Sequence, residues 1–348
     1  IEFRTKLFRV SGSITDLHLL DLVTGSADFA LQIRPVDVDV DGGGLNNISS
    51  TADLDDATLL TFALRIPSSA TPTQTVRVGI DGVGIEISSG EIGVATIKPA
   101  DTTDTRSYLA VRGQDLAASL FGLDVLEAQV SRIAIDLNQA KTSTLEITPL
   151  DWSQALDIDQ DGIFGENGNP AGETIDDLVN PGADLPAPAD LTIDFGGKLL
   201  RVSGSLTDLN LFDIVTGSAD FALVVRDVDV DVDGGGLNNV SATGDLEDAK
   251  LTTIALRVPS TATPLQPIQI GLSGVGVEIS SGELGVVLLN PADSTVDSRS
   301  FMAIRAQNLA ASLLGIDLLQ VALANVGIDV NQAKSNAGAI DALNWTPA

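Results

Sequence analysis

The residues of this chain best suited to chemistry are aspartates spaced two apart ahead of a glycine. Asp157, Asp159 and Asp161 precede Gly162 in the run DIDQDG. Carboxylates at the first, third and fifth positions of such a loop can converge on one cation, and the backbone carbonyl of the seventh position, here Ile163, can add a further oxygen. Calcium takes roughly six to eight hard oxygen ligands of this kind. The run therefore predicts a calcium site.

This loop departs from the helix-loop-helix calcium motif at its last position. Position twelve is Gly168 and not the glutamate that usually closes the site, so the closing ligand must come from elsewhere. The candidates are Glu166, Glu173 and Asp176. In this respect the loop resembles those of dockerin-like, thrombospondin-like and integrin-like repeats. A solvated acidic loop without an ion is the alternative interpretation.

A second candidate is a row of three alternating aspartates that occurs twice, each time directly before a glycine. The rows are Asp37, Asp39 and Asp41, and Asp229, Asp231 and Asp233. Repulsion between like charges is a reason to expect a cation there. A half-buried strand would also place every second residue on one face, so a purely structural explanation stays open. Acidic clusters at 53–56 and 245–248 either complete such sites or belong to turns.

The aspartate row occurs twice because the chain contains an internal repeat. KLFRVSGSITDLHLLDLVTGSADFAL begins at Lys6, and a near copy begins at Lys198. The match continues to Trp152 and its counterpart Trp345, with one residue inserted in the second copy before Arg299. We therefore expect two repeat units, 1–152 and 191–348, joined by a connector at 153–190 that is rich in Asp, Gly, Pro and Asn.

The elements that must position these residues have the period-two pattern of β-strands. Aromatic residues make up only 4% of the chain, so the cores must be built from Val, Ile, Leu and Ala. GVGIEISSGEIGVATI suggests a hairpin that turns at 88–90. We predict an all-β fold of long, mostly antiparallel strands, elongated overall, in which each unit is either a sandwich or a solenoid-like twisted sheet.

Composition weighs against several classes of function. The 48 acidic and 19 basic residues give a formal net charge of -29, which disfavours nucleic acid and anionic lipid as partners. There is no cysteine, and the single histidine, His18, corresponds to Asn210 in the second copy, so nucleophilic catalysis has no visible machinery. No apolar run is long enough for a membrane-spanning helix, so we expect no membrane insertion. The chain is predicted not to be an enzyme.

Two long segments resemble a known class of repeat. DTRSYLAVRGQDLAASLFGLDVLEAQVSRIAIDLNQA at 104–140 and its partner at 297–333 are similar to units of giant repeat proteins of aquatic bacteria. In those units a D-x-R-S-aromatic segment precedes a G-I/L-D turn and an N-Q-A ending. The resemblance implies a very long cell-surface or secreted protein with calcium-binding or adhesin-like neighbours. It therefore implies an extracellular location.

These observations predict a non-enzymatic, calcium-binding spacer or adhesive module of a large extracellular repeat protein. Calcium in the connector would stiffen a joint that otherwise bends freely. The expected partners are neighbouring repeat units of the same chain, with a cell-surface or glycan ligand as a further candidate. A polysaccharide- or partner-binding module and a self-assembling filament or surface-layer subunit are the alternatives.

Overall fold

The structure is a computed structural model of the whole chain, and it divides into two compact units. It describes residues 6–19, 22–45, 48–49, 52–80, 82–123, 126–165, 177–237, 240–241, 244–262, 265–316 and 319–345. Unit 1 comprises 1–122 with 132–199, and unit 2 comprises 123–131 with 200–348. The predicted connector, 153–190, therefore lies in unit 1 together with 191–199, and the whole segment 153–198 is called the connector below. Within the described ranges, no helix has the length and apolar character needed to cross a membrane.

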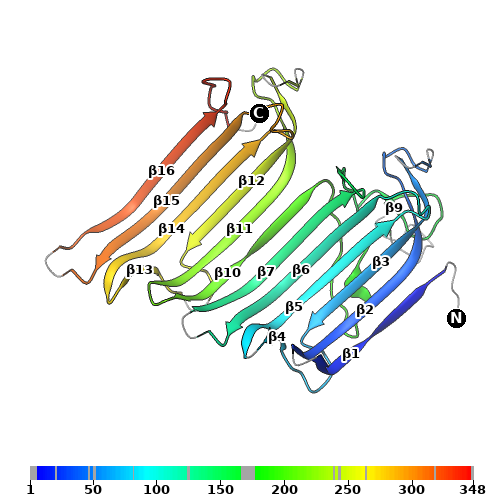
Figure 1. Cartoon of the computed structure of the whole chain (residues 1–348), viewed down its shortest axis with the longest axis horizontal. Coiled ribbons are helices and arrows are strands. Elements are labelled where there is room, and N and C mark those ends of the chain that lie inside the picture. Colours follow the sequence, from blue (N-terminus) through cyan, green and yellow to red (C-terminus); the bar gives the residue numbers. More distant parts are fainter. Residues whose placement is uncertain are drawn as a thin grey trace. The chain divides into compact units, whose positions relative to one another are not determined.

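Unit 1 contains an antiparallel sheet with the strand order β1-β2-β3-β5-β6-β7, in which the first six residues of β7, 126–131, are assigned to unit 2 (Figure 1). The short strands β4, β8 and β9 pair with β2 and β5, with β7, and with β2, respectively. The bounds are β1 Phe8–Leu19, β2 Val23–Val38, β3 Leu54–Ile66, β4 Val76–Ile80, β5 Val83–Lys98, β6 Ser107–Phe121, β7 Leu126–Lys141, β8 Glu146–Ile147 and β9 Leu156–Asp157. The connector adds the 3-10 helix η1, Pro181–Asp184.

Unit 2 repeats this topology, with the order β10-β11-β12-β14-β15-β16 and the short β13 paired with β11 and β14. Its strands are β10 Leu199–Leu211, β11 Val215–Val230, β12 Leu246–Val258, β13 Ile268–Leu272, β14 Val275–Asn290, β15 Ser300–Leu314 and β16 Ala322–Lys334. The all-β, antiparallel prediction is confirmed. In each unit these strands follow one hydrogen-bonded path, so of the two alternatives the twisted sheet is closer than the sandwich; the elongated arrangement stays a prediction.

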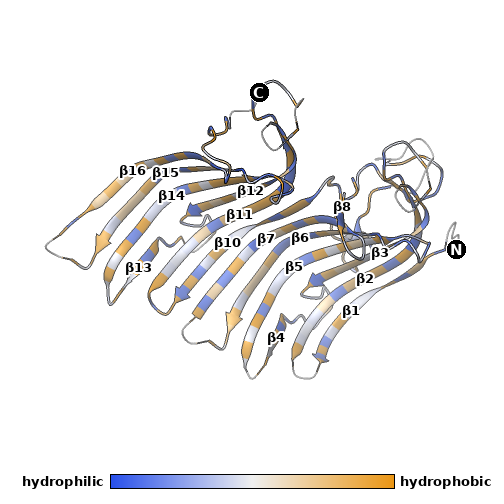
Figure 2. Cartoon of the chain, turned by 45° about the horizontal axis from the view of Figure 1, so that its top comes forward, coloured by the Kyte–Doolittle hydropathy of each residue, from blue (hydrophilic) through white to orange (hydrophobic). Residues whose placement is uncertain are grey.

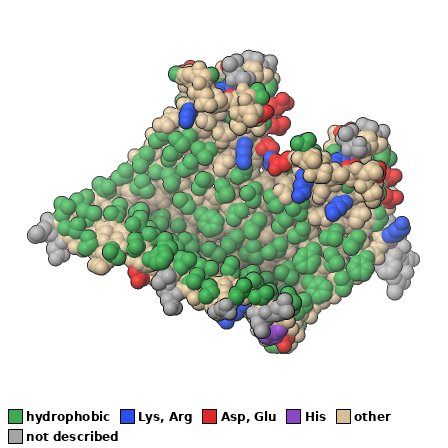
Figure 3. Space-filling model, in the orientation of Figure 1, with side chains coloured by type: hydrophobic (Ala, Val, Ile, Leu, Met, Phe, Trp, Pro, Cys, Tyr) green, Lys and Arg blue, Asp and Glu red, His purple; other side chains and the backbone are tan. Residues whose placement is uncertain are grey.

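Side-chain chemistry is distributed unevenly along the strands. Hydrophobic and hydrophilic residues alternate along much of the sheets (Figure 2), as the period-two pattern predicts. In the view of Figure 3, hydrophobic side chains cover much of the visible sheet surface, and most of the charged ones lie toward the upper loops of each unit. Among the candidate metal-binding aspartates, Asp39 and Asp231 directly follow the ends of β2 and β11.

The hairpin expected at 88–90 is wrong, because β5 runs unbroken through it. The register with β6 shifts on both sides of Ser89, between Ile87 and Glu91, and Gly90 has a φ of 138°. A Cβ on Gly90 would lie 2.7 Å from the Cα of Leu116. Glycine here marks a bulge where two strands approach closely, and not a turn.

The connector covers part of the sheet of unit 1. Its 3-10 helix contacts β2, β3 and β5. Leu185, Ala189 and Leu191 form a buried cluster with Ala30 of β2 and Ala63 of β3. The acidic, proline-rich composition of the connector suggested a loop between units, whereas its apolar residues pack as a second layer on unit 1.

The connector is entered through a buried tryptophan. Trp152 is fully buried, and its indole N–H donates to Oδ1 of Asn138 at 3.0 Å. Nδ2 of Asn138 donates to the carbonyls of Leu150 at 2.8 Å and Gly197 at 2.7 Å. One amide on β7 thus fixes both ends of the connector.

Candidate metal centres

Three groups of aspartates in the described part of the chain could hold a metal ion. In each group, carboxylate oxygens from three residues lie within 4.8 Å of one another. The groups are Asp39, Asp41 and Asp53; Asp157, Asp159 and Asp177; and Asp231, Asp233 and Asp245. Two of them lie in unit 1 and one in unit 2.

The first group is built by the loop between β2 and β3. Asp39 accepts hydrogen bonds from the backbone N–H of Gly42 at 2.7 Å and of Gly44 at 2.8 Å. Both glycines have positive φ angles, which curl the chain back over this carboxylate. The N–H of Val40 donates to Asp53 at 3.0 Å, and this bond holds the remote carboxylate beside the loop.

The loop between β11 and β12 in unit 2 repeats this arrangement. Asp231 accepts from the N–H of Gly234 at 2.7 Å and of Gly236 at 2.7 Å. The N–H of Val232 donates to Asp245 at 3.0 Å. Asp53 and Asp245 are both buried, with exposed fractions of 0% and 1%. A buried carboxylate needs such compensation, because burial disfavours its charged form.

The connector loop has the same geometry although its sequence differs. Asp157 accepts from the N–H of Gln160 at 2.6 Å and of Gly162 at 2.7 Å. The N–H of Ile158 donates to Asp177 at 2.7 Å. In each cluster we call Asp39, Asp231 or Asp157 the first aspartate, and Asp53, Asp245 or Asp177 the remote aspartate. In all three loops the first aspartate accepts hydrogen bonds from the backbone N–H groups of the third and fifth residues after it. The N–H of the residue directly after it donates to the remote aspartate.

Burial raises the pKa of the first carboxylate in the connector loop. Desolvation is the main cause of the raised pKa of Asp157, and the charge of Asp161 acts in the same direction. Backbone hydrogen bonds from Gly162, Gln160 and Asp161 oppose this effect. A bound cation would favour the ionised form of this carboxylate in the same way that a positive side chain does.

Six of the predicted ligands lie in these clusters, two in each: Asp157 with Asp159, Asp39 with Asp41, and Asp231 with Asp233. Asp161 lies outside the connector cluster, is exposed, and accepts the N–H of Ile163 at 2.8 Å. The side chain of Ile163 is also exposed, and a role for its carbonyl stays a prediction. Glu166, Glu173 and Asp176 lie outside the described residues.

The remote carboxylate of the connector is Asp177, which is not among the ligands predicted from the spacing of the aspartates. A signal for it exists, because the remote aspartate precedes a leucine in all three cases, in the pairs Asp53-Leu54, Asp177-Leu178 and Asp245-Leu246. Acidic clusters at 53–56 and 245–248 were candidates for completing the sites, and one residue of each does lie in a cluster.

The aspartates that begin the two sequence rows, Asp37 and Asp229, have a different role from the aspartates of the clusters. Asp37 and Asp229 lie within β2 and β11, and they accept the N–H of Asp56 at 2.8 Å and of Asp248 at 2.9 Å. Asp56 and Asp248 both have a φ of 51°. The purely structural explanation therefore applies to Asp37 and Asp229, which lie in strands and outside the clusters. Each accepts a hydrogen bond from a residue of the neighbouring strand that has a positive φ. The strands end one residue later, and the other two aspartates of each row lie in the loops.

The connector loop is fixed to unit 1 beside the β2–β3 loop. Asp37 and Asp157 are partners in the register of β2 and β9, and the N–H of Asp39 donates to the carbonyl of Ala155 at 2.8 Å. Arg34 of β2 donates to the carbonyl of Ile158. Burial lowers the pKa of Arg34, and the charges of Asp159 and Asp177 partly offset that effect. The loop therefore joins the connector to the sheet of unit 1.

An arginine positions the remote aspartate of each unit. Arg106 pairs with Asp104 at 2.7 Å, with side-chain exposures of 5% and 7%, and donates to the carbonyls of Ser49 at 2.7 Å and Ala52 at 2.6 Å. Ala52 directly precedes Asp53.

Arg299 repeats this arrangement in unit 2. It pairs with Asp297 at 2.7 Å and donates to the carbonyls of Ser241 at 2.9 Å and Gly244 at 2.7 Å. Gly244 directly precedes Asp245. The D-x-R-S motif thus anchors the loop that carries the remote carboxylate.

Comparison of the chain with protein-family models, curated proteins and solved structures gives no match. Its function is therefore inferred from its own residues and their geometry.

Proposed function

We propose that this chain is a non-enzymatic, calcium-binding spacer or adhesive module of a large extracellular repeat protein. The observation that carries the proposal is that the same hydrogen-bonded arrangement of three aspartates occurs three times among the described residues. Two copies of this arrangement follow from the internal repeat. The third, in the connector, has a different loop sequence and still reproduces the hydrogen bonds of the first aspartate and of the remote one.

The chemistry of the clusters favours calcium over other metals. Every side-chain ligand is a carboxylate oxygen, and each cluster offers three. Soft or borderline metals favour sulfur and imidazole ligands, whereas calcium and magnesium favour oxygen. Calcium accepts irregular, expandable coordination, and backbone carbonyls and water complete its shell. Magnesium demands near-octahedral geometry and keeps most of its water.

A cation in each cluster would join two segments that are distant in sequence. In the units it would bind the end of one strand to the start of the next, through Asp39 with Asp53 and through Asp231 with Asp245. In the connector it would fix the two ends of the segment between Asp157 and Asp177. Metal binding that links such segments contributes directly to folding stability. We therefore propose that calcium stiffens the repeat units and holds the connector in place.

An extracellular location is part of the proposal. Extracellular calcium modules work with dissociation constants of about 10⁻⁴–10⁻³ M, because calcium outside the cell is abundant. The formal charge of -29 would be partly neutralised by bound ions. The resemblance of 104–140 and 297–333 to surface repeat proteins supports the same location.

Thermal unfolding with and without calcium tests the proposal. Calcium at a hundredfold excess over its dissociation constant should stabilise the folded chain by about 2.7 kcal/mol for one site, so chelation should lower the melting temperature clearly. Asp53→Asn and Asp245→Asn should each reduce this calcium-dependent gain. The control is Asp16→Asn, which removes an exposed carboxylate paired only with His18 among the described ion pairs. Unchanged melting after chelation would contradict the proposal.

A partner-binding module is the second candidate, and one observation favours it. A groove on the sheet of unit 2 exposes residues whose counterparts in unit 1 are covered by the connector. The test of this candidate is the binding experiment that follows from the groove.

A further inference from the structure

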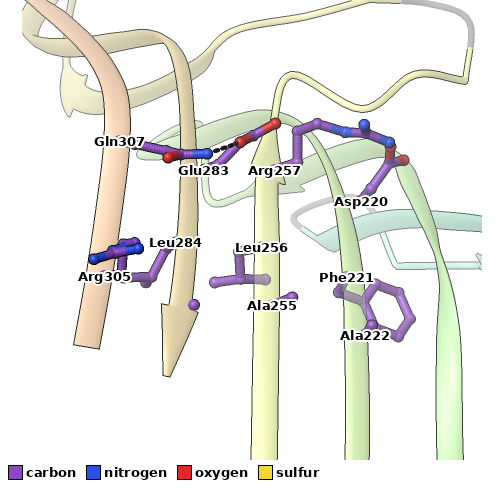
Figure 4. A pocket seen from close by; sticks show the side chains of 11 residues that line it. Asp220, Phe221, Ala222, Ala255, Leu256, Arg257, Glu283, Leu284, Arg305 and Gln307 are labelled. Atoms are coloured by element: carbon purple, nitrogen blue, oxygen red, sulfur yellow. Dashed lines mark hydrogen bonds and ion pairs between the residues drawn. The ribbon is translucent and has the colours of Figure 1, made fainter. Parts of the chain in front are cut away.

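Unit 2 carries an open groove on β11, β12, β14 and β15 (Figure 4). Its volume is about 500 Å³, and Ala222, Ala255, Gly285, Arg257 and Arg305 are among its lining residues. A second groove of about 690 Å³ shares Gly285 and Arg305 with it and extends to Trp345. The internal repeat allows each lining residue to be compared with its counterpart in unit 1.

The counterparts of the groove floor are buried by the connector in unit 1. Ala30 and Ala63, which correspond to Ala222 and Ala255, are 2% and 0% exposed beneath Leu185, Ala189 and Leu191. In unit 2, Ala222 is half-buried and Ala255 is exposed. The floor has the same small residues in both units, but only in unit 1 does a described segment lie over it.

The two groove arginines also have connector partners in unit 1. Arg65 donates to the carbonyl of Ala187 at 2.6 Å. Arg112 donates to Asp194 at 2.8 Å and lies 5.0 Å from the ring centroid of Phe195. Their side chains are 24% and 23% exposed. Arg65 therefore binds a backbone carbonyl of the connector, and Arg112 binds two of its side chains.

The corresponding arginines of unit 2 are far more accessible. The side chains of Arg257 and Arg305 are 50% and 76% exposed. Arg257 turns to Asp220 at 2.8 Å, and Arg305 pairs with Asp329 at 2.8 Å (Figure 4 shows Arg257 beside Asp220). Unit 2 thus keeps both cationic groups of the connector site in an exposed state.

Gly93 of unit 1 and its counterpart Gly285 in unit 2 also differ in whether the connector lies against them. A Cβ at Gly93 would lie 3.1 Å from the Cβ of Leu191 and 3.2 Å from Pro181, so the connector needs glycine there. At the corresponding Gly285 the nearest atom is the carbonyl oxygen of Arg305, at 3.9 Å. Glycine inside a strand weakens it, and it often marks a place where another backbone approaches closely.

The end of unit 2 also reproduces the entry to the connector. The indole N–H of Trp345 donates to Asn331 at 3.0 Å, as that of Trp152 donates to Asn138. Nδ2 of Asn331 donates to the carbonyl of Leu343 at 3.0 Å. Trp345 is only half-buried, whereas Trp152 is fully buried. Cover over the groove would therefore also bury Trp345.

We propose that the groove of unit 2 is a docking site for a connector-type peptide segment, with the chemistry that residues 179–195 show on unit 1. Such a segment has a Pro-Gly turn, leucine and alanine side chains that cover the alanine floor, and an aspartate followed by phenylalanine for Arg305. Its backbone approaches Gly285 closely. This inference goes beyond the proposed calcium binding and does not depend on it.

Titration of the whole chain with a synthetic peptide of residues 177–197 tests this proposal. The peptide contains no tryptophan, so the tryptophan fluorescence of the chain reports binding. We expect saturable one-to-one binding that shields Trp345 from acrylamide quenching, both in calcium and in chelator. A peptide of the same composition in scrambled order is the control ligand.

Gly285→Val identifies the site. The space above Gly285 tolerates a side chain, so this variant should fold normally and lose peptide binding, and urea unfolding of the free variant checks the fold. Arg305→Ala should weaken binding about tenfold, because the aspartate of the peptide loses its partner.

Equal binding of the peptide and its scrambled control, or full binding to Gly285→Val, would overturn the proposal. Self-association of the chain that Gly285→Val abolishes, without peptide binding, would also overturn it, since the groove would then accept a second copy. Loss of calcium binding with peptide binding intact would contradict only the proposed function.

Discussion

Replacement of Arg106 by methionine removes the group that anchors the loop before Asp53. The guanidinium binds Asp104 through three N–H···O contacts of 2.7–3.1 Å, and it binds the carbonyls of Ser49 and Ala52. Methionine keeps much of the apolar stem and none of the hydrogen bonds. The variant therefore removes the guanidinium from the carbonyls of Ser49 and Ala52 and from the buried carboxylate of Asp104, which keeps the backbone N–H of residue 106 at 3.0 Å.

The expected cost follows from the burial of this pair. Removal of one partner of a buried ion pair typically costs about 3–5 kcal/mol, because the remaining charge is uncompensated. Asp104 is only 7% exposed on its side chain, so water can solvate it little. The double variant Asp104→Asn with Arg106→Met should recover part of this loss, because it leaves no buried charge.

Urea unfolding followed by the fluorescence of buried Trp152, in a Trp345→Phe background, measures the effect on unit 1. Arg9→Met is the matched control, since Arg9 is 51% exposed and its pair with Asp184 should contribute at most about 1 kcal/mol. Arg106→Met should also weaken calcium binding without altering any ligand. If it costs no more than Arg9→Met, the role assigned to the D-x-R-S motif is refuted.

Three further predictions concern the packing and charge of the two units. Asn138→Ala should destabilise unit 1 by about 2–4 kcal/mol, because the buried N–H of Trp152 loses its acceptor. Asn331→Ala should destabilise unit 2 much less, because Trp345 is only half-buried. Urea unfolding of both variants checks the difference. Gly93→Val should destabilise unit 1 by about 1–3 kcal/mol by overpacking, and hydrogen exchange of the connector should increase; unchanged exchange would contradict the packing described. Burial alone would raise the pKa of Asp220, but side-chain and backbone hydrogen bonds lower it below the usual value of about 3.9. Unit 2 should therefore lose stability as the pH falls below that value. Asp220→Asn should show a flatter dependence of stability on pH.

The internal repeat and the strand pattern made much of the fold predictable. Alternating Val, Ile and Leu indicated long antiparallel strands, and the structure confirms them. The error at 88–90 arose because two serines and a glycine suggest a turn, although Gly90 is a bulge that accommodates Leu116. Local sequence cannot distinguish these cases, since the bulge depends on a residue of the neighbouring strand.

The candidate metal sites were predictable in part. Each aspartate row supplies two ligands from one loop, and these were expected from their spacing. The remote carboxylates come from a second segment, and in the connector Asp177 is held by the N–H of Ile158, a contact between distant residues that spacing does not reveal. The covering of unit 1 by the connector was not predictable either, because acidic and proline-rich composition hides the few apolar residues that pack, such as Leu185 and Leu191.

Counting the bound ions tests most directly whether the three aspartate clusters bind calcium. Equilibrium dialysis against millimolar calcium, at moderate salt, gives the number of ions bound per chain. We predict three ions for the natural sequence and two for each of Asp53→Asn, Asp177→Asn and Asp245→Asn, with Asp16→Asn unchanged. No bound calcium, or a count that these three substitutions leave unchanged, would contradict the account.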